Sequence, residues 1–248
     1  MAGAALLGRL TWQVGEVMET RAENPRTRTL VVDLPHWPGH RAGQHVDIRL
    51  TAEDGYQATR SYSIASSPED QHVAVTVERL DEGEVSPYLV DDVLPGDRLE
   101  FRGPIGGYFV WDVSRGGPLF LVAGGSGIVP LMAMIRHRMA QRSEVPVTLL
   151  YSVRSLEDVI YGAERDRLAS AGITVVNTFT RTAPEGWTGF GRRIDRDLLV
   201  KVAPPSNVLP LVYVCGPTPF VETVSGLLVA LGHDPGRIYT ERFGATGR

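Results

Sequence analysis

The alternation of hydrophobic and polar residues changes near residue 113 and divides the chain into two halves. The first half predicts short strands that are rich in β-branched residues and are separated by clusters of Pro, Gly and Asp. These strands span residues 10–17, 27–34, 44–50, 58–64, 72–79 and 97–102. Because no segment of this half predicts a long helix, we expect a closed, six-stranded antiparallel β-barrel.

In the second half, buried-strand runs alternate with segments of helical length. The strand runs are 119–123, 147–151, 173–178, 211–215 and 237–240. This alternation predicts an α/β fold with a doubly wound parallel sheet. We therefore expect two domains, residues 1–113 and 114–248. The Pro- and Gly-rich stretch 181–193 is expected to be the largest loop of the second domain and to line a ligand site.

Composition narrows the possible partners. The 248 residues carry a net charge of −4, and the 25 Lys and Arg are interspersed with 29 Asp and Glu. Without a basic tail or stripe, the chain is not expected to bind nucleic acid. The apolar runs are shorter than the roughly 18 residues of a membrane span, so we expect no membrane span and a cytoplasmic location. The single cysteine, Cys215, cannot hold zinc or an iron-sulfur cluster, and we expect no metal site.

Two segments of the first half suit a flavin nucleotide. Arg60-Ser61-Tyr62-Ser63 lies on a predicted barrel strand, where alternation places Arg60 and Tyr62 on one face. An arginine can pair with phosphate through two nitrogens, and a tyrosine can stack on a flavin ring. The turn 83–86 precedes a helix-like stretch, 87–94, and offers amides and a hydroxyl to a second anion. Two phosphate-competent sites suit FAD better than FMN, although the first segment could also be a solvated barrel exterior.

Two segments of the second half suit another nucleotide. The glycine-rich run 124–130 follows a predicted strand and opens a helix whose first turn contains Pro130. Its backbone amides and the positive end of the helix would attract a pyrophosphate. Cys215-Gly216-Pro217 ends another strand at the same sheet edge. The alternatives are a tight turn without a ligand and a cysteine that is an ordinary buried residue.

In their order and spacing, these four motifs resemble the ferredoxin-NADP reductase superfamily, specifically its compact bacterial oxygenase-reductase branch, over essentially the whole chain. The residues that match the flavin motifs are Arg60, Tyr62, Ser63, Gly83, Val85 and Ser86. Those that match the nicotinamide-nucleotide motifs are Gly124, Gly125, Gly127, Ile128, Pro130, Cys215, Gly216 and Pro217. The terminal segment 241–244 is similar to one that lies near the flavin in the family, where Phe243 would shield the ring.

The resemblance implies an FAD-dependent NAD(P)H oxidoreductase in which a hydride passes from the nicotinamide to flavin N5. Ser63 would hydrogen-bond near N5 and Cys215 would border the nicotinamide, which makes them the catalytic candidates. Relatives hold the 2′-phosphate of NADP at the place of Thr180 and Arg181, and this chain has two more arginines, Arg192 and Arg193, further along. We therefore expect NADP as the second cofactor, NAD remaining possible, and these arginines could also be solvated loop charges. Arg154 completes the expected cofactor-binding residues.

The electron acceptor is expected to be a separate protein that carries an iron-sulfur or haem centre, such as a ferredoxin, because one cysteine cannot ligate a cluster. Two other functions stay open. The protein could reduce free flavin, ferric chelates or quinones without a protein partner. It could also be a redox-inert nucleotide-binding subunit.

Overall fold

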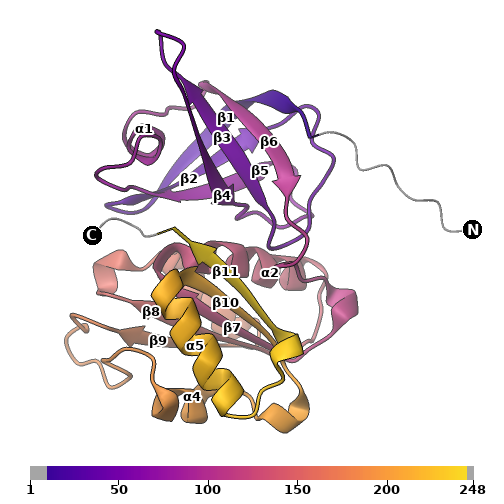
Figure 1. Cartoon of the computed structure of the whole chain (residues 1–248), viewed down its shortest axis with the longest axis vertical. Helices are drawn as coiled ribbons and strands as arrows, with labels where there is room; N and C mark the ends of the chain where they lie inside the picture. The colour runs from indigo at the N-terminus through magenta and orange to yellow at the C-terminus, as the bar shows by residue number, and fades with distance from the viewer. Residues whose placement is uncertain (1–9, 245–248) are drawn as a thin grey trace, which may run out of the picture.

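The structure is a computed structural model that describes residues 10–244. The outer ends of the two expected domains, residues 1–9 and 245–248, lie outside the described residues. Figure 1 shows the two halves stacked along the long axis, with the strand-rich half above a sheet flanked by helices. The expected boundary between residues 113 and 114 falls between the last strand of the first half and the first strand of the second.

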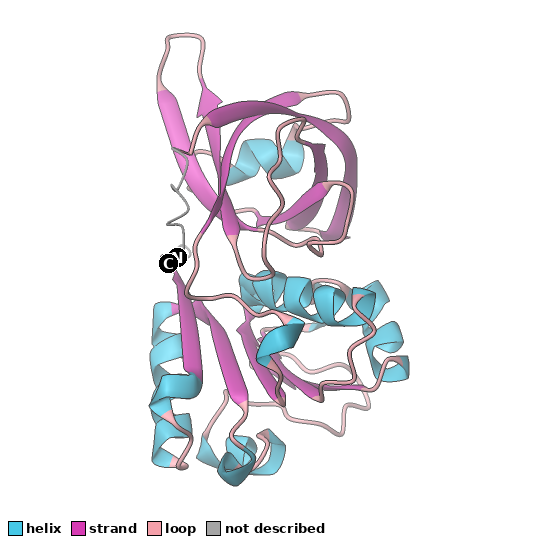
Figure 2. Ribbon diagram, turned by 90° about the vertical axis from the view of Figure 1, so that its right-hand side faces the viewer, coloured by secondary structure: helices cyan, strands magenta, loops and turns pink. Residues whose placement is uncertain are grey.

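The first half is a six-stranded antiparallel sheet that curls into a barrel, seen end-on in Figure 2. Its strands are β1 (Trp12–Asn24), β2 (Thr27–Asp33), β3 (His45–Thr51), β4 (Gln57–Ser63), β5 (Val73–Glu78) and β6 (Arg98–Ile105). They are ordered β4-β3-β6-β1-β2-β5, and an isolated antiparallel bridge between Ile64 and Val75 joins the two edges. The expected barrel is confirmed. A short helix, α1 (Ser86–Asp91), follows β5.

Strand β1 continues seven residues beyond the expected end at residue 17. Its second part pairs with β2, from Glu19 opposite Val31 to Asn24 opposite Thr27. Of the strand, only Gly15 and Val17 are fully buried. Because backbone hydrogen bonds rather than an apolar face hold the second part, hydrophobic periodicity does not reveal it.

The second half is a five-stranded parallel sheet, as expected. Its strands are β7 (Leu119–Gly124), β8 (Val147–Val153), β9 (Ile173–Phe179), β10 (Leu211–Pro217) and β11 (Ile238–Phe243), in the order β11-β10-β7-β8-β9. The helices are α2 (Ile128–Ala140), α3 (Arg165–Ser170), α4 (Arg196–Val202) and α5 (Thr218–Ala230). Within residues 10–244, no helix combines the length and apolar character required to cross a bilayer.

Strand β7 is buried on both faces, which explains its continuous apolar sequence. Leu119 and Leu121 pack in the core that includes α2, whereas Phe120 and Val122 pack in the core that includes α4 and α5. The chain leaves β7 toward β8 on one side, and β10 pairs with its other side. The carboxyl ends of β7 and β10 therefore form the switch point at which open α/β sheets bind ligands.

Two of the hydrogen bonds between the halves involve α2 and the segment after β8. The Arg136 NH1 atom donates to the carbonyl oxygen of Ala65 at 2.6 Å. The hydroxyl groups of Tyr161 and Thr76 are buried and lie 2.5 Å apart. Figure 1 shows α2 and the end of β11 directly beneath the barrel, so these contacts fix the position of the barrel over the sheet edge.

Candidate active site

Two adjoining cavities lie between the barrel and the sheet edge. The barrel cavity has a volume of about 590 Å³ and the sheet cavity about 480 Å³. Three residues line both of them: Glu78, Ser126 and Phe243. Ligands in the two cavities would therefore meet at these residues, one from each of β5, the β7–α2 turn and β11.

The barrel cavity contains the residues expected to bind flavin. Its wall includes Arg60, Tyr62 and Ser63 of β4, Gly83 and Val85 of the turn before α1, and Ser86, the first residue of α1. The Arg60 NH2 atom lies 2.5 Å from the Glu84 Oε2 atom. Burial raises the pKa of the Tyr62 phenol well above its usual range, so the ring is neutral at physiological pH. The wall therefore combines a flat aromatic surface with a guanidinium group.

The turn before α1 is tight because of Gly83. The Leu80 N–H donates to the Ser86 Oγ atom at 3.0 Å. A Cβ atom on Gly83 would lie 2.8 Å from that same oxygen. A larger residue would therefore displace the Ser86 hydroxyl from the position that the cavity presents.

The sheet cavity has a floor of glycine backbone. Gly124, Gly125 and Ser126 line it, and Gly125 has a φ angle of +56°. A Cβ atom on Gly124 would lie 2.9 Å from the Phe220 ring. A side chain at Gly124 would clash with this wall, so the backbone itself forms the floor of the cavity. Because this floor lies at the amino end of α2, it suits a nucleotide pyrophosphate.

Three residues of the glycine motif support this floor without lining either cavity: Gly127, Ile128 and Pro130. All are buried, and Ile128 and Pro130 belong to the first turn of α2. A Cβ atom on Gly127 would lie only 2.1 Å from the carbonyl oxygen of Cys215. The absence of a side chain at Gly127 therefore allows the β7–α2 turn to touch the end of β10.

The Cys-Gly-Pro motif reaches the cavities through one residue. Pro217 lines the sheet cavity, whereas Cys215 and Gly216 line neither cavity. Cys215 is completely buried, and burial raises the pKa of its thiol. Its role beside a nicotinamide ring stays a prediction.

The arginines expected to hold the 2′-phosphate divide into two groups. Thr180 and Arg154 line the sheet cavity together with Arg193. Arg181 and Arg192 do not line it, and the Arg192 Nε atom lies 3.0 Å from the Asp195 Oδ2 atom. Of the residues expected near the 2′-phosphate, Thr180 and Arg193 therefore lie closer to the sheet cavity than Arg181 and Arg192.

The most important residue that sequence reasoning gave no role is Glu241. The Ser63 hydroxyl donates to the Glu241 Oε1 atom at 3.3 Å, and both residues line the barrel cavity. Burial raises the pKa of the Glu241 carboxyl to about 7. Glu241 pairs in register with Cys215 on β10. The signal in the sequence that could have identified it is its position near the carboxyl end of the last strand.

Comparison with known proteins identifies both halves. Residues 15–110 match the oxidoreductase FAD-binding domain, and residues 121–226 match the oxidoreductase NAD-binding domain. The NADH oxidoreductase HCR of Escherichia coli is 31% identical over 94% of this chain and 68% of its own length. The glycine betaine monooxygenase reductase subunit of Pseudomonas aeruginosa is 32% identical over 89% of this chain. The FAD/NAD-binding domain of nitric oxide dioxygenase from Vibrio cholerae is similar with a TM-score of 0.82 and 25% identity, covering 93% of this chain and 98% of that domain.

The chain belongs to the ferredoxin-NADP reductase-like family of FAD- and NAD-binding oxidoreductases. The match covers 61% of the length of the Pseudomonas aeruginosa subunit, so that relative is longer than this chain. The two cavities fit the two cofactors of the family, because one offers an aromatic and cationic wall and the other a glycine cradle.

The contact between Gly127 and Cys215 leads to a prediction. We expect Gly127→Ala to weaken NADP⁺ binding at least tenfold while FAD binding is kept, because the added methyl group displaces the β7–α2 turn. Calorimetric titration of the FAD-loaded protein measures this. Gly226→Ala is the control, since a Cβ atom there meets nothing within 4 Å. Wild-type affinity in Gly127→Ala would contradict the proposed role of this contact.

Proposed function

We propose that the protein takes a hydride from NAD(P)H onto FAD and passes electrons singly to an acceptor outside these 248 residues. The observation that carries this proposal is the junction of the two cavities at Glu78, Ser126 and Phe243. Hydride transfer requires two rings in van der Waals contact, and little else from the protein. A shared wall between a flavin cavity and a nucleotide cavity supplies that requirement.

The residues of each wall position one cofactor. When bound, FAD accepts a hydride at N5 and can release electrons one at a time. Tyr62 packs against the ring system, while Arg60 and the turn ending at Ser86 bind the phosphates. The amides of Gly124–Ser126 bind the pyrophosphate of the nicotinamide nucleotide. Phe243 belongs to both walls, so it lies where the two cofactors would meet.

Ser63 and Glu241 form a path for the proton that leaves with the electrons. Because the Ser63 hydroxyl donates to Glu241, its oxygen can accept a proton from a donor in the barrel cavity. The Glu241 carboxylate then takes the hydroxyl proton of Ser63, which the donor's proton replaces. A carboxyl whose pKa is about 7 can both accept and release a proton near neutral pH.

The identity of the acceptor is proposed from the relatives. The Pseudomonas aeruginosa protein is named as the reductase subunit of a monooxygenase. This chain contains one cysteine, so it cannot supply the four protein ligands of an iron-sulfur cluster. We therefore place the iron-sulfur or haem centre of the acceptor outside these residues, with a ferredoxin as the first candidate. Reduction of free flavin is the second candidate, because the wall of the barrel cavity includes the exposed side chains of Arg60 and Glu84.

A panel of acceptors tests the proposed function. Protein purified with FAD should be yellow, should lose its colour on anaerobic addition of NADPH, and should then reduce a ferredoxin faster than free FMN or a quinone. Faster reduction of FMN or a quinone would favour the second candidate. Protein that fails to bind FAD, or whose flavin NAD(P)H does not reduce, would refute the proposal.

The Ser63–Glu241 pair predicts a pH dependence. The pKa of Glu241 is raised, so its carboxylate form, which accepts the proton, becomes the major form above about pH 7. We expect electron delivery to the acceptor to rise with pH through about 7 and to level off above it. In Glu241→Gln the rise of the rate with pH should disappear, and kcat should fall about 100-fold. Ser61→Ala is the control, because the Ser61 hydroxyl donates to Asp47 rather than to Glu241, and this variant should keep the rise of the rate with pH. A pH profile of Glu241→Gln that matches wild type would remove Glu241 from the proton path.

The arginines of the sheet cavity predict a preference for NADPH. We expect Arg193→Gln to raise KM for NADPH about tenfold and KM for NADH less than twofold, because a dianionic 2′-phosphate loses a charged donor. Arg192→Gln serves as the neighbouring control, since Arg192 is paired with Asp195. Steady-state kinetics with both nucleotides measure this. Equal changes for NADPH and NADH would refute the preference.

A further inference from the structure

The turn between β1 and β2 brings three barrel residues to the wall of the sheet cavity: Asn24, Arg26 and Thr27. Thr27 pairs across the strands with Glu78, which lines both cavities. Arg26 is therefore adjacent to the junction of the cavities, at the end of the sheet cavity that is nearest the flavin. None of the four sequence motifs includes this turn.

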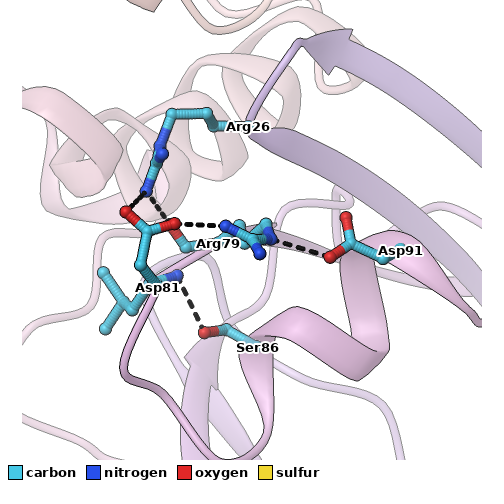
Figure 3. Close-up of polar contacts among 6 residues, drawn as sticks. Arg26, Arg79, Asp81, Ser86 and Asp91 are labelled. Atoms are coloured by element: carbon cyan, nitrogen blue, oxygen red, sulfur yellow. Dashed lines mark hydrogen bonds and ion pairs between the residues drawn. The ribbon is translucent and has the colours of Figure 1, made fainter.

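Arg26 uses only one of its three side-chain nitrogens in the contacts shown in Figure 3. The NH2 atom donates to the Arg79 carbonyl oxygen at 2.9 Å and to the Asp81 Oδ2 atom at 3.1 Å. Among the described residues, the Nε and NH1 atoms of Arg26 have no hydrogen-bond partner. The side chain is half-exposed, so these donors are accessible to a ligand in the cavity.

Asp81 does not depend on Arg26 for a counter-ion. Figure 3 shows Asp81 between two arginines, Arg26 and Arg79. Arg79 bonds to the Asp81 Oδ1 atom, and its Nε atom donates to the Asp91 Oδ2 atom at 2.7 Å. Exposed ion pairs of this kind contribute little to stability. Arg26 can therefore exchange Asp81 for another anion and leave Asp81 paired with Arg79.

The other arginines of the sheet cavity lie elsewhere on its wall. Arg154 follows β8, and Arg193 lies in the loop before α4, so both come from the far side of the sheet relative to β10 and β11. Arg26 is the one lining arginine that the barrel supplies, on the described part of the chain. This separation places Arg26 on a different part of a bound dinucleotide from Arg154 and Arg193.

We propose that Arg26 binds the pyrophosphate of the nicotinamide nucleotide, so that the flavin-binding half supplies part of the nucleotide site. The inference rests on the proposed function, because it requires a nicotinamide dinucleotide in the sheet cavity. The planar guanidinium fork matches two phosphate oxygens, and the NH2 atom, once it releases Asp81, forms that fork together with the open Nε or NH1 donor. Asp81 competes with the phosphate for Arg26, so the ion pair between Asp81 and Arg26 lowers the affinity for the nucleotide.

Calorimetric titration of the FAD-loaded protein with NADP⁺ and with NAD⁺ tests the inference. Arg26→Gln should raise Kd about tenfold for both nucleotides, because the pyrophosphate is common to them. Asp81→Asn should lower Kd two- to threefold, since it releases Arg26, and this gain should vanish in the double variant. Arg21→Gln in the preceding strand β1 is the control, because Arg21 pairs with Glu19 and lines neither cavity.

The outcomes separate this inference from the proposed function. If Asp81→Asn weakens binding as Arg26→Gln does, the pair is only structural and the inference fails. It also fails if Arg26→Gln binds both nucleotides like wild type, or if only NADP⁺ binding is lost, which would assign Arg26 to the 2′-phosphate. If the wild-type protein binds neither nucleotide, the proposed function itself fails.

Discussion

The contact between the carboxyl ends of β7 and β10 is the constraint on which the candidate site depends. Gly127 allows the β7–α2 turn to touch the carbonyl oxygen of Cys215, and this contact sets the glycine floor of the sheet cavity beside β10. Strand β11 pairs with the other side of β10 and carries Glu241 and Phe243 to the barrel cavity. A single backbone approach therefore fixes the positions of the glycine floor, Glu241 and Phe243 relative to one another.

The barrel has to be held over this edge for the cavities to join. The buried bond between Tyr161 and Thr76 and the bond from the charged Arg136 side chain to Ala65 connect the two halves, contributing about 1 kcal/mol and about 2 kcal/mol respectively. Burial raises the pKa of the Tyr161 phenol to about 12, so it remains a neutral hydrogen-bonding group over the physiological range. Because these contacts are made by the chain itself, they hold the two halves at this distance without a bound cofactor.

Local signals in the sequence predicted the fold and the cofactor motifs, whereas contacts between the halves were not predictable. The apolar run of β7 and the glycines after it identify a buried strand and its turn without reference to other residues. The end of β1 was missed because its polar residues are held by pairing with β2. Arg26 and Glu78 acquire their positions only when the barrel docks on the sheet, and no local pattern marks them, whereas the segment that contains Glu241 was expected near the flavin without a role for its carboxyl group. The burial of Cys215 and the position of Arg181 outside the cavity likewise depend on tertiary packing.

The central claim is that the two cofactor rings meet directly at the junction of the cavities. Anaerobic stopped-flow reduction of the bound FAD by NADPH, and by NADPH carrying deuterium at the transferred C4 position, tests this most directly. Direct contact predicts rapid loss of flavin absorbance and a severalfold slower rate with the deuterated nucleotide. Flavin that is not reduced by the nucleotide, although both are bound, would contradict the account.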